Sequence, residues 1–147
     1  MTVNKNKTYI EKNLIQQEWY IINAENQNLG RLSSKIAYTL KGKRSNKYTP
    51  HLNHKINIII INSKLIKITG NKKKQKKYKR HSGRPGGLKV ETFEKLQQRI
   101  PNRILEKSIK GMLPKNTLGR KLFAQLKIYS DNIHPHSSQK PKMLKLN

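Results

Sequence analysis

The sequence predicts an α/β protein in which two parallel strands are joined through a helix. Residues 18–22 are rich in aromatic and β-branched side chains, which favour a short strand. Residues 29–40 place apolar side chains three and four positions apart, as an amphipathic helix does. Residues 56–61 are isoleucine at five of six positions, which is typical of a parallel strand buried on both faces. A strand, a helix and a strand in this order predict a right-handed βαβ crossover.

The boundaries of the first helix follow from its flanking residues. Asn28 precedes the first apolar position, and its side chain can accept hydrogen bonds from free backbone N–H groups. Gly42 follows the last apolar position and ends the helix. Residues 43–55 are polar and basic, so they predict a loop. After the buried strand, residues 65–69 alternate between apolar and polar and predict a half-exposed strand.

The second half of the chain predicts three more helices and a last strand. Thr92 is placed to cap a helix that carries Phe93 and Leu96. Pro101 suits the first turn of the next helix, and Pro114 breaks it. Asn116 is placed to cap the third helix. The apolar positions of the last two helices are Ile104, Leu105, Ile109, Met112, Leu118, Leu122, Phe123 and Leu126, and residues 127–129 predict the strand.

The length of 147 residues predicts one domain with extended ends. We expect an arm over residues 1–17, a single α/β domain over 18–129 and a tail over 130–147. Within the domain, residues 70–89 predict a long basic loop, since they contain little apolar sequence and several glycines. Leu, Ile, Val and Phe make up 36 residues. That fraction lies above the level of about 20% below which a highly charged chain stays disordered.

Positive charge is the strongest functional signal. The chain carries 33 Lys and Arg against 7 Asp and Glu, a formal net charge of +26. Such an imbalance opposes compaction unless a polyanion neutralises it, and nucleic acid is the polyanion that we expect. The run from Lys72 to Arg80 is almost entirely cationic and can displace counterions from phosphates. Tyr78 within it suits stacking on a base. A solvated surface in a lysine-biased proteome is the alternative interpretation.

Two neighbouring segments allow both a functional and a structural interpretation. Residues 81–89 combine His81 and Arg84 with glycines that permit a close backbone approach, but an ordinary glycine-rich turn would look the same. The cations around residues 41–55 suit contact with phosphates, and they also complement the dipole at the end of a helix. Spacing alone leaves both pairs of alternatives open.

Catalytic, metal and membrane patterns are nearly missing from the sequence. Asp131 is the single aspartate, whereas a two-metal nuclease needs several clustered carboxylates. The chain has no cysteine, and the pair His134 and His136 supplies only half of a metal site, so we expect the tail to pack on RNA instead. No apolar stretch approaches the length of a membrane span, and the N-terminal residues lack a transit- or signal-peptide pattern. A DNA-binding architectural protein and an RNA-processing enzyme are the rival classes.

Several blocks of the sequence, taken in order, resemble the bacterial-type family of large-subunit ribosomal protein thirteen. The most specific match is the stretch Lys110, Gly111, Met112, Leu113, Pro114 and Lys115. Further matching blocks, in the same order and spacing, are residues 19–24, 29–32, 40–43, 48–51, 61–62, 69–72, 81–83, 86–87, 118–120, 126–129 and 134–136. Together they cover about residues 18–142.

The resemblance implies a mainly parallel four-stranded sheet flanked by helices. It also implies binding to large-subunit ribosomal RNA beside neighbouring ribosomal proteins, a role in early subunit assembly, and no catalysis, cofactor, small-molecule substrate or membrane. The excess of Lys, Asn and Ile, whose codons are rich in A and T, predicts a plastid-encoded copy, with an AT-rich bacterium as the alternative. The residues expected to contact RNA are Lys41, Lys43, Arg44, Lys47, Tyr48, His51, Lys72, Lys73, Lys74, Lys76, Lys77, Tyr78, Lys79, Arg80, His81, Arg84, Lys110, Lys115, Arg120, Lys121, His134 and His136.

Overall fold

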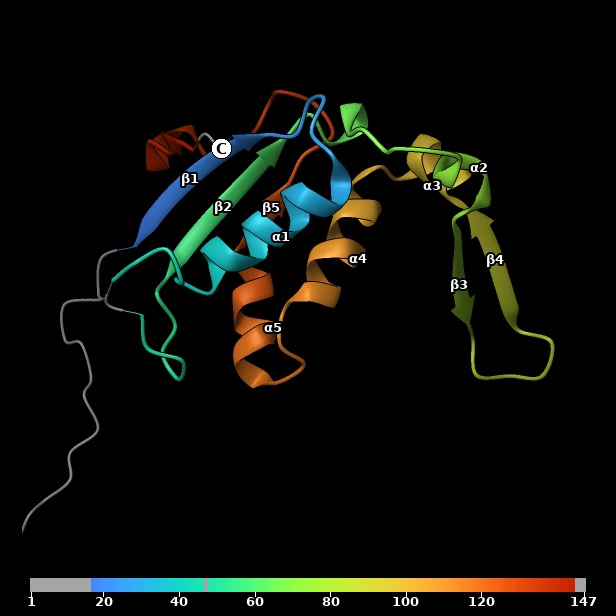
Figure 1. The fold of residues 1–147 in the computed structure, drawn as a ribbon, viewed down its shortest axis with the longest axis horizontal. Helices are drawn as coiled ribbons and strands as arrows, with labels where there is room; N and C mark the ends of the chain where they lie inside the picture. Colours follow the sequence, from blue (N-terminus) through green and yellow to red (C-terminus); the bar gives the residue numbers. More distant parts are fainter. Residues whose placement is uncertain (1–16, 47, 145–147) are drawn as a thin grey trace, which may run out of the picture.

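A four-stranded parallel sheet forms the centre of the protein (Figure 1). The structure is a computed structural model that describes residues 17–46 and 48–144. The strands are β1 (Glu18–Asn23), β2 (Ile56–Ile61), β5 (Leu126–Ile128) and β6 (Lys142–Met143), in the order β5-β2-β1-β6. Every neighbouring pair is parallel, and β1 and β2 run in register from Glu18 opposite Ile56 to Asn23 opposite Ile61. The predicted α/β class and parallel sheet are confirmed.

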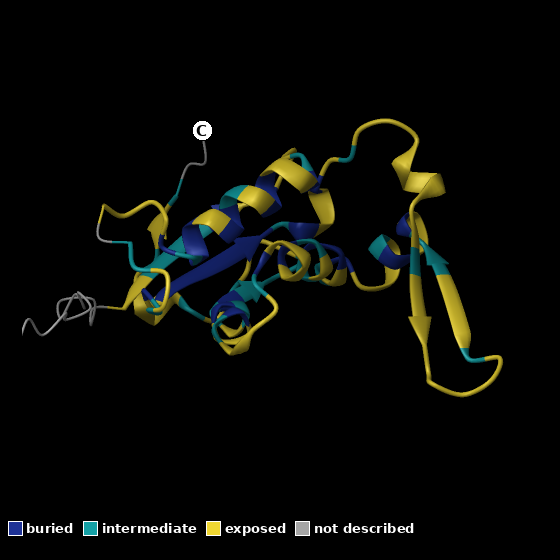
Figure 2. Cartoon of the chain, turned by 60° about the horizontal axis from the view of Figure 1, so that its bottom comes forward, coloured by how far each residue is buried: buried dark blue, intermediate teal, exposed yellow. Residues whose placement is uncertain are grey.

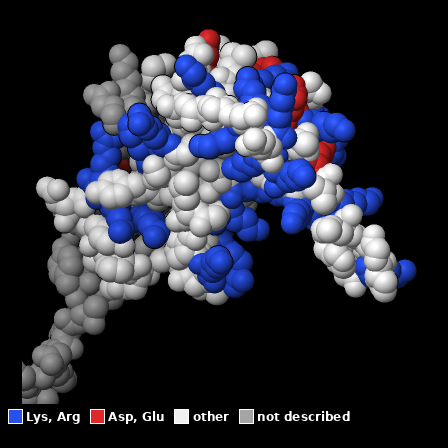
Figure 3. Space-filling view, turned by 45° about the vertical axis from the view of Figure 1, so that its right-hand side comes forward, with Lys and Arg blue, Asp and Glu red and all other residues white. Residues whose placement is uncertain are grey.

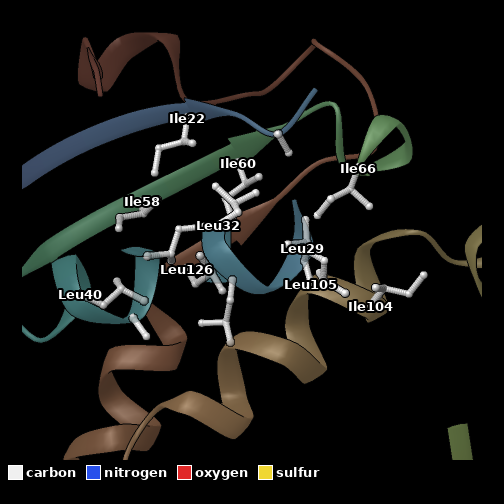
Figure 4. Close-up of a cluster of buried hydrophobic side chains, with 14 of the residues drawn as sticks. Ile22, Leu29, Leu32, Leu40, Ile58, Ile60, Ile66, Ile104, Leu105 and Leu126 are labelled. Carbon is white, nitrogen blue, oxygen red and sulfur yellow. The ribbon is translucent and has the colours of Figure 1, made fainter. Parts of the chain in front are cut away.

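Three helices cover one face of this sheet. They are α1 (Leu29–Leu40), α4 (Asn102–Met112) and α5 (Thr117–Ala124), and Figure 1 shows them beneath the strands. All six residues of β2 are buried, as the isoleucine run predicts. Ile58 and Ile60 project from β2 toward Leu32 of α1 and Leu105 of α4 (Figure 4). Apolar side chains from sheet and helices thus form one core, which appears as the buried interior in Figure 2.

The chain after β5 crosses the other face of the sheet and then joins its edge. It passes through a short 3-10 helix, η2 (Ser137–Gln139), before β6 pairs with β1. The His136 ring lies 5.4 Å from the ring of Trp19, and its Nε2 lies 2.8 Å from the Tyr129 hydroxyl. Part of the segment that the sequence assigns to a tail therefore supplies a strand. A two-residue strand has no periodicity to reveal it.

The predicted strand over residues 65–69 is wrong. This stretch begins in a 3-10 helix, η1 (Ser63–Leu65), and continues as an extended segment that pairs through a single bridge between Lys67 and Asn28. Lys67 N donates to Gln27 O at 2.9 Å, and Lys67 O accepts from Leu29 N at 3.1 Å. The alternation of side chains is real, but only one residue pair lies beside another extended chain.

The basic loop predicted over residues 70–89 contains regular structure. A short helix, α2 (Lys72–Gln75), leads into an antiparallel hairpin of β3 (Lys77–His81) and β4 (Leu88–Thr92). The hairpin projects away from the body (Figure 1), and α3 (Phe93–Arg99) follows it. Most of its residues are exposed (Figure 2), and apolar alternation is limited to Leu88 and Val90 of β4, so the sequence gives only a weak indication of strands. Gly83 and Gly86 turn the chain with φ of +87° and +71°.

The three helices predicted for the second half are present as α3, α4 and α5. Asn116 caps α5, since its Oδ1 accepts a hydrogen bond from Gly119 N at 2.8 Å. Thr92 and Asn28 occupy the N-cap positions of α3 and α1, but neither side chain makes the predicted cap hydrogen bond. The division into one domain with two terminal extensions stays a prediction, and residues 1–16 of the expected arm lie outside the described part of the chain.

Candidate nucleic-acid interface

Three groups of predicted contact residues lie on the helical side of the sheet or extend from it (Figure 1). One is the loop after α1, one is the corner between α4 and α5, and one is the α2–β3–β4 extension. Figure 3 shows Lys and Arg spread over much of one face of the molecule, with Asp and Glu at only a few points of that face. The described acids are partly neutralised by close cations: Asp131 by Lys64, Glu91 by Arg99 and Glu106 by Arg103.

The loop after α1 is organised around a buried histidine. His54 is only 5% exposed and its ring stacks on Tyr48, with centroids 5.9 Å apart. Lys43 Nζ lies 5.8 Å from the centre of the Tyr48 ring. Thr49 N donates to His54 Nε2 at 3.5 Å, which is a weak bond. This packing gives the loop a defined shape, and His54 is not among the residues predicted to contact RNA.

The other predicted residues of this loop differ in exposure. Lys41 is the C-cap residue of α1 and is half-buried. Lys43, Arg44 and His51 are exposed and available to a partner. Lys47 lies outside the described residues. The position of Lys41 fits the structural interpretation of helix-end cations, whereas the exposed residues fit contact with phosphates.

The run from Lys72 to Arg80 is divided between a helical turn and a strand. Lys72, Lys73 and Lys74 lie on α2 and are exposed. Along β3, successive side chains point to opposite faces, so Lys77 and Lys79 share one face and Arg80 lies on the other. At the end of the strand, His81 Nδ1 accepts a hydrogen bond from Gly83 N at 2.9 Å, and Arg84 is exposed at the hairpin tip. The cations thus reach both faces of a projecting element.

Tyr78 joins the hairpin to the body. Its ring lies 6.4 Å from the Phe93 ring of α3. Lys76 Nζ and Lys107 Nζ lie 5.5 and 5.0 Å from its centre. Burial raises the pKa of the Tyr78 hydroxyl above its ordinary value of 10.0. These contacts give Tyr78 a packing role, and its expected stacking on a base stays a prediction.

A cleft of about 410 Å³ lies where the hairpin meets α3 and α4. Its cationic lining includes Arg80, Lys89, Arg99, Arg103 and Lys107. Arg99 donates two hydrogen bonds to Glu91, at 3.1 and 2.8 Å. Hydrogen bonding to Arg99 is the main reason that the pKa of Glu91 lies below its ordinary value of 4.5.

Of the five cations that line this cleft, sequence analysis predicted only Arg80 and missed Lys89, Arg99, Arg103 and Lys107. The last two lie on α4. With Lys110 they recur on α4 at spacings of four and three residues, and all three are exposed. That spacing places them on one side of the helix. Their helical periodicity is the sequence signal that indicates them, whereas the predicted helix was defined by its apolar positions alone.

The corner between α4 and α5 brings Lys110, Lys115 and Arg120 together around a second cleft, of about 330 Å³. Phe123 also lines this cleft, and Lys110 Nζ lies 5.7 Å from the centre of its ring. Lys121 is exposed on the neighbouring position of α5. These are the residues for which the family resemblance implied contact with RNA, and the fold places three of the four at one site.

The two predicted tail histidines lie apart from the other groups. His134 and His136 stack on each other, with centroids 6.4 Å apart. They belong to the segment between β5 and β6, which crosses the face of the sheet opposite the helices (Figure 1). Both are half-buried, and His136 contacts Trp19 and Tyr129. Within residues 17–46 and 48–144, no group of three or more His, Asp or Glu is arranged to hold a metal ion. These ring contacts give both imidazoles a packing role, and their expected contact with RNA stays a prediction.

Fold and surface together define a basic α/β protein whose exposed loop, hairpin and helix corner suit a polyanion. Over the described residues, no helix has the length and apolar character that a membrane crossing requires. The sequence profile of the family described as Ribosomal protein L13 matches residues 17–135. The chain belongs to this family, as the resemblance predicted.

Several relatives agree with this assignment over nearly their whole length. The chain is 63% identical to "Large ribosomal subunit protein uL13c" of Gracilaria tenuistipitata var. liui, over 95% of this chain and 97% of the relative. It is 56% identical to "Large ribosomal subunit protein uL13" of Microchaete diplosiphon, over 96% and 94%. It is also 56% identical to the uL13c protein of Porphyra purpurea, over 93% and 96%.

Proposed function

We propose that this protein is a structural, non-catalytic constituent of the large ribosomal subunit. It binds large-subunit ribosomal RNA, lies beside other proteins of that subunit and supports early assembly. Family membership over residues 17–135 is the observation that carries this proposal. The distribution of charge supports it, because cations on three separate elements face outward from one folded body.

In this function the body acts as a rigid support for basic extensions. The hairpin and the loop after α1 lie along phosphates of different RNA segments and hold those segments together. Lys and Arg neutralise phosphates and release counterions, which makes the affinity depend strongly on salt. Such contacts position the protein on RNA without reading its sequence. A protein with net charge +26 gains folded-state stability when the bound polyanion neutralises it.

The contribution of the hairpin is tested with a matched pair of double variants. Lys77→Gln with Lys79→Gln removes two exposed charges from β3, and Lys140→Gln with Lys142→Gln removes two exposed charges near β6. Filter binding to a large-subunit rRNA transcript is measured over a range of salt concentrations. The slope of log K against log salt is negative, and each lost phosphate contact reduces its magnitude by about 0.7–0.9. We therefore expect the magnitude of the slope to fall by roughly 1.4–1.8 in the hairpin variant. Equal slopes for both variants would reject the hairpin as an RNA contact.

Competition separates RNA binding from the DNA-binding alternative. Labelled rRNA transcript is bound to the full chain and challenged with unlabelled transcript or with duplex DNA at equal phosphate concentration. An RNA-binding protein contacts 2′-hydroxyls and irregular loops, so we expect the transcript to compete more strongly. Equal competition by duplex DNA would favour the architectural class. Co-sedimentation of tagged protein with the large subunit after a high-salt wash tests its place in the ribosome.

The cellular location belongs to the same proposal. We place the protein in a plastid ribosome, because its excess of Lys, Asn and Ile fits an AT-rich organelle genome. Its 63% identity to the Gracilaria protein supports this location. The cytoplasm of an AT-rich bacterium is the alternative. Hybridisation of the gene to purified plastid DNA gives a signal in the first case and none in the second.

A further inference from the structure

We propose that the cleft between α4 and α5 binds one unstacked nucleobase of the RNA partner. The Phe123 ring supplies the surface on which the base stacks, and Lys110, Lys115 and Arg120 hold the adjoining phosphates. This inference rests on the proposed RNA-binding function and assigns a specific chemistry to one part of it. We call this cleft, defined by Lys110, Leu113, Pro114, Lys115, Gly119, Arg120 and Phe123, the corner cleft.

The walls of the corner cleft are held in place by a buried side chain, a helix cap and a close approach of two backbone segments. Helix α4 ends at Met112 and α5 begins at Thr117, so a short connection forms one wall. Leu113 is 4% exposed and anchors that connection in the core. Asn116 fixes its other end through the hydrogen bond to Gly119 N. An added Cβ at Gly119 would lie 1.8 Å from Pro114 O, so the absence of a side chain there allows the two segments to touch.

An aromatic ring lies inside this cleft within reach of a cation. Phe123 is half-buried, and the ammonium group of Lys110 lies over its ring at 5.7 Å from the centroid. A base that stacks on the ring would leave Lys110 free to pair with a phosphate. The volume of about 330 Å³ lies near the lower end of the range for small-molecule sites, which suits one base and not a folded segment.

Charge favours nucleic acid as the occupant. Every charged residue that lines the corner cleft is a cation. By contrast, the cleft at the hairpin base contains Glu91, which already pairs with Arg99. Base stacking on an aromatic side chain tolerates any base and combines with a positively charged groove that follows the backbone. A side-chain ring flanked by three cations provides both parts of that arrangement.

The test compares two aromatic-to-leucine variants of the full chain on a large-subunit rRNA transcript. Phe123→Leu retains an apolar side chain but removes the aromatic face. Tyr38→Leu is the matched control, since Tyr38 is 53% exposed on α1 and does not line the corner cleft. We expect Phe123→Leu to raise Kd at least about 5-fold, the lower bound for loss of one base–aromatic stack, with an unchanged salt slope. We expect the control to stay within about 2-fold of the wild type.

A second measurement does not depend on a variant that folds. Wild-type protein is cross-linked to transcript containing 4-thiouridine, and the cross-linked peptide is identified. Cross-links within residues 110–123 support the proposal. Cross-links confined to other segments, or a Phe123→Leu variant that is folded and binds as tightly as wild type, overturn it.

The outcomes also separate this inference from the proposed function. If wild-type protein does not bind the transcript, the proposed function itself fails. If it binds and only the Phe123 prediction fails, rRNA binding stands and the corner cleft is not a base site. An acidic peptide that competes for wild type but not for Phe123→Leu, with RNA affinity unchanged, would assign the cleft to a protein segment and overturn the proposal.

Discussion

Substitution of Gly119 by alanine is a sensitive test of how α5 packs against the connection before it. Gly119 is buried and lies in the first turn of α5. A Cβ at this position would lie 1.8 Å from Pro114 O and 2.8 Å from Pro114 C. Both are backbone atoms, so rotation of a side chain cannot relieve the contact. The separation from Pro114 O would have to grow from 1.8 Å to at least 3.0 Å.

Three effects set the size of the loss. Overpacking of this kind typically costs about 1–3 kcal/mol. Movement of the connection also strains the 2.8 Å bond from Gly119 N to Asn116, and loss of an N-cap typically costs about 1 kcal/mol. Replacement of glycine by alanine in a helix returns about 0.5–1 kcal/mol. We therefore expect a net loss of about 1–3 kcal/mol in the free energy of unfolding, or roughly 3–10 °C in Tm.

The assay is thermal unfolding of the free protein followed by circular dichroism, because bound RNA would add stability by mass action. Gly111→Ala is the matched control: Gly111 lies near the end of α4, and an added Cβ there meets no atom within 4 Å. This control should have a Tm equal to or slightly above that of wild type. If Gly119→Ala is as stable as Gly111→Ala, then α5 and the connection are not in close contact and the walls of the corner cleft are wrongly placed.

Two further predictions concern the loop after α1 and the hairpin base. Gly42→Ala should destabilise the protein more than Gly70→Ala does in urea unfolding, by about 1–3 kcal/mol. Both glycines have positive φ, +73° and +67°, but only the Cβ at Gly42 would collide, 2.3 Å from the His54 ring. Equal losses would disprove the His54 packing. The hydrogen bonds from Arg99 lower the pKa of Glu91 in the folded protein. The ion pair therefore stabilises the fold at any pH above the pKa that Glu91 has in the unfolded chain. This stabilisation is lost as the pH falls through the lower pKa of Glu91 in the folded protein. Between about pH 6 and pH 3, the urea midpoint of unfolding should fall less in Glu91→Gln than in wild type. An equal fall in the two proteins would contradict the pairing.

The elements that the sequence predicted well are those whose side chains pack against the core. Residues 56–61 are apolar at nearly every position, and β2 is buried at all six. The spacing of Leu29, Leu32, Ile36 and Leu40 matches the buried side of α1. In these elements the buried positions carry apolar residues, because burial of an apolar side chain away from water is favourable. The sequence pattern therefore follows the pattern of burial.

The elements that the sequence missed pair through backbone or lie exposed. Strand β3 is mostly basic, and the two apolar side chains of β4, Leu88 and Val90, are exposed, so the hairpin has nearly the composition of a loop. Strand β6 has two residues, and its pairing with β1 depends on where the chain arrives after it crosses the sheet. Backbone hydrogen bonds do not select residue type, so β6 leaves no sequence pattern and the hairpin leaves only the short alternation of Leu88 and Val90.

The candidate interface divides in the same way. Net charge and the run from Lys72 to Arg80 are properties of composition, and they indicate a polyanion without any coordinates. The grouping of Lys110, Arg120 and Phe123 around one cleft depends on the turn between α4 and α5. The separation of His134 and His136 from the other predicted contact residues depends on the path of the chain between β5 and β6.

The sequence by itself determined the βαβ core, the excess of positive charge and the blocks that identify the family. Local residue type is sufficient for these, because burial and charge act on each side chain separately. Only the tertiary structure decided that residues 70–89 form a hairpin, that Tyr78 packs on Phe93 and that residues 142–143 close the sheet edge. These features depend on which distant segments come into contact. The free energy of such a contact depends on both surfaces together, so neither segment's sequence reveals it alone.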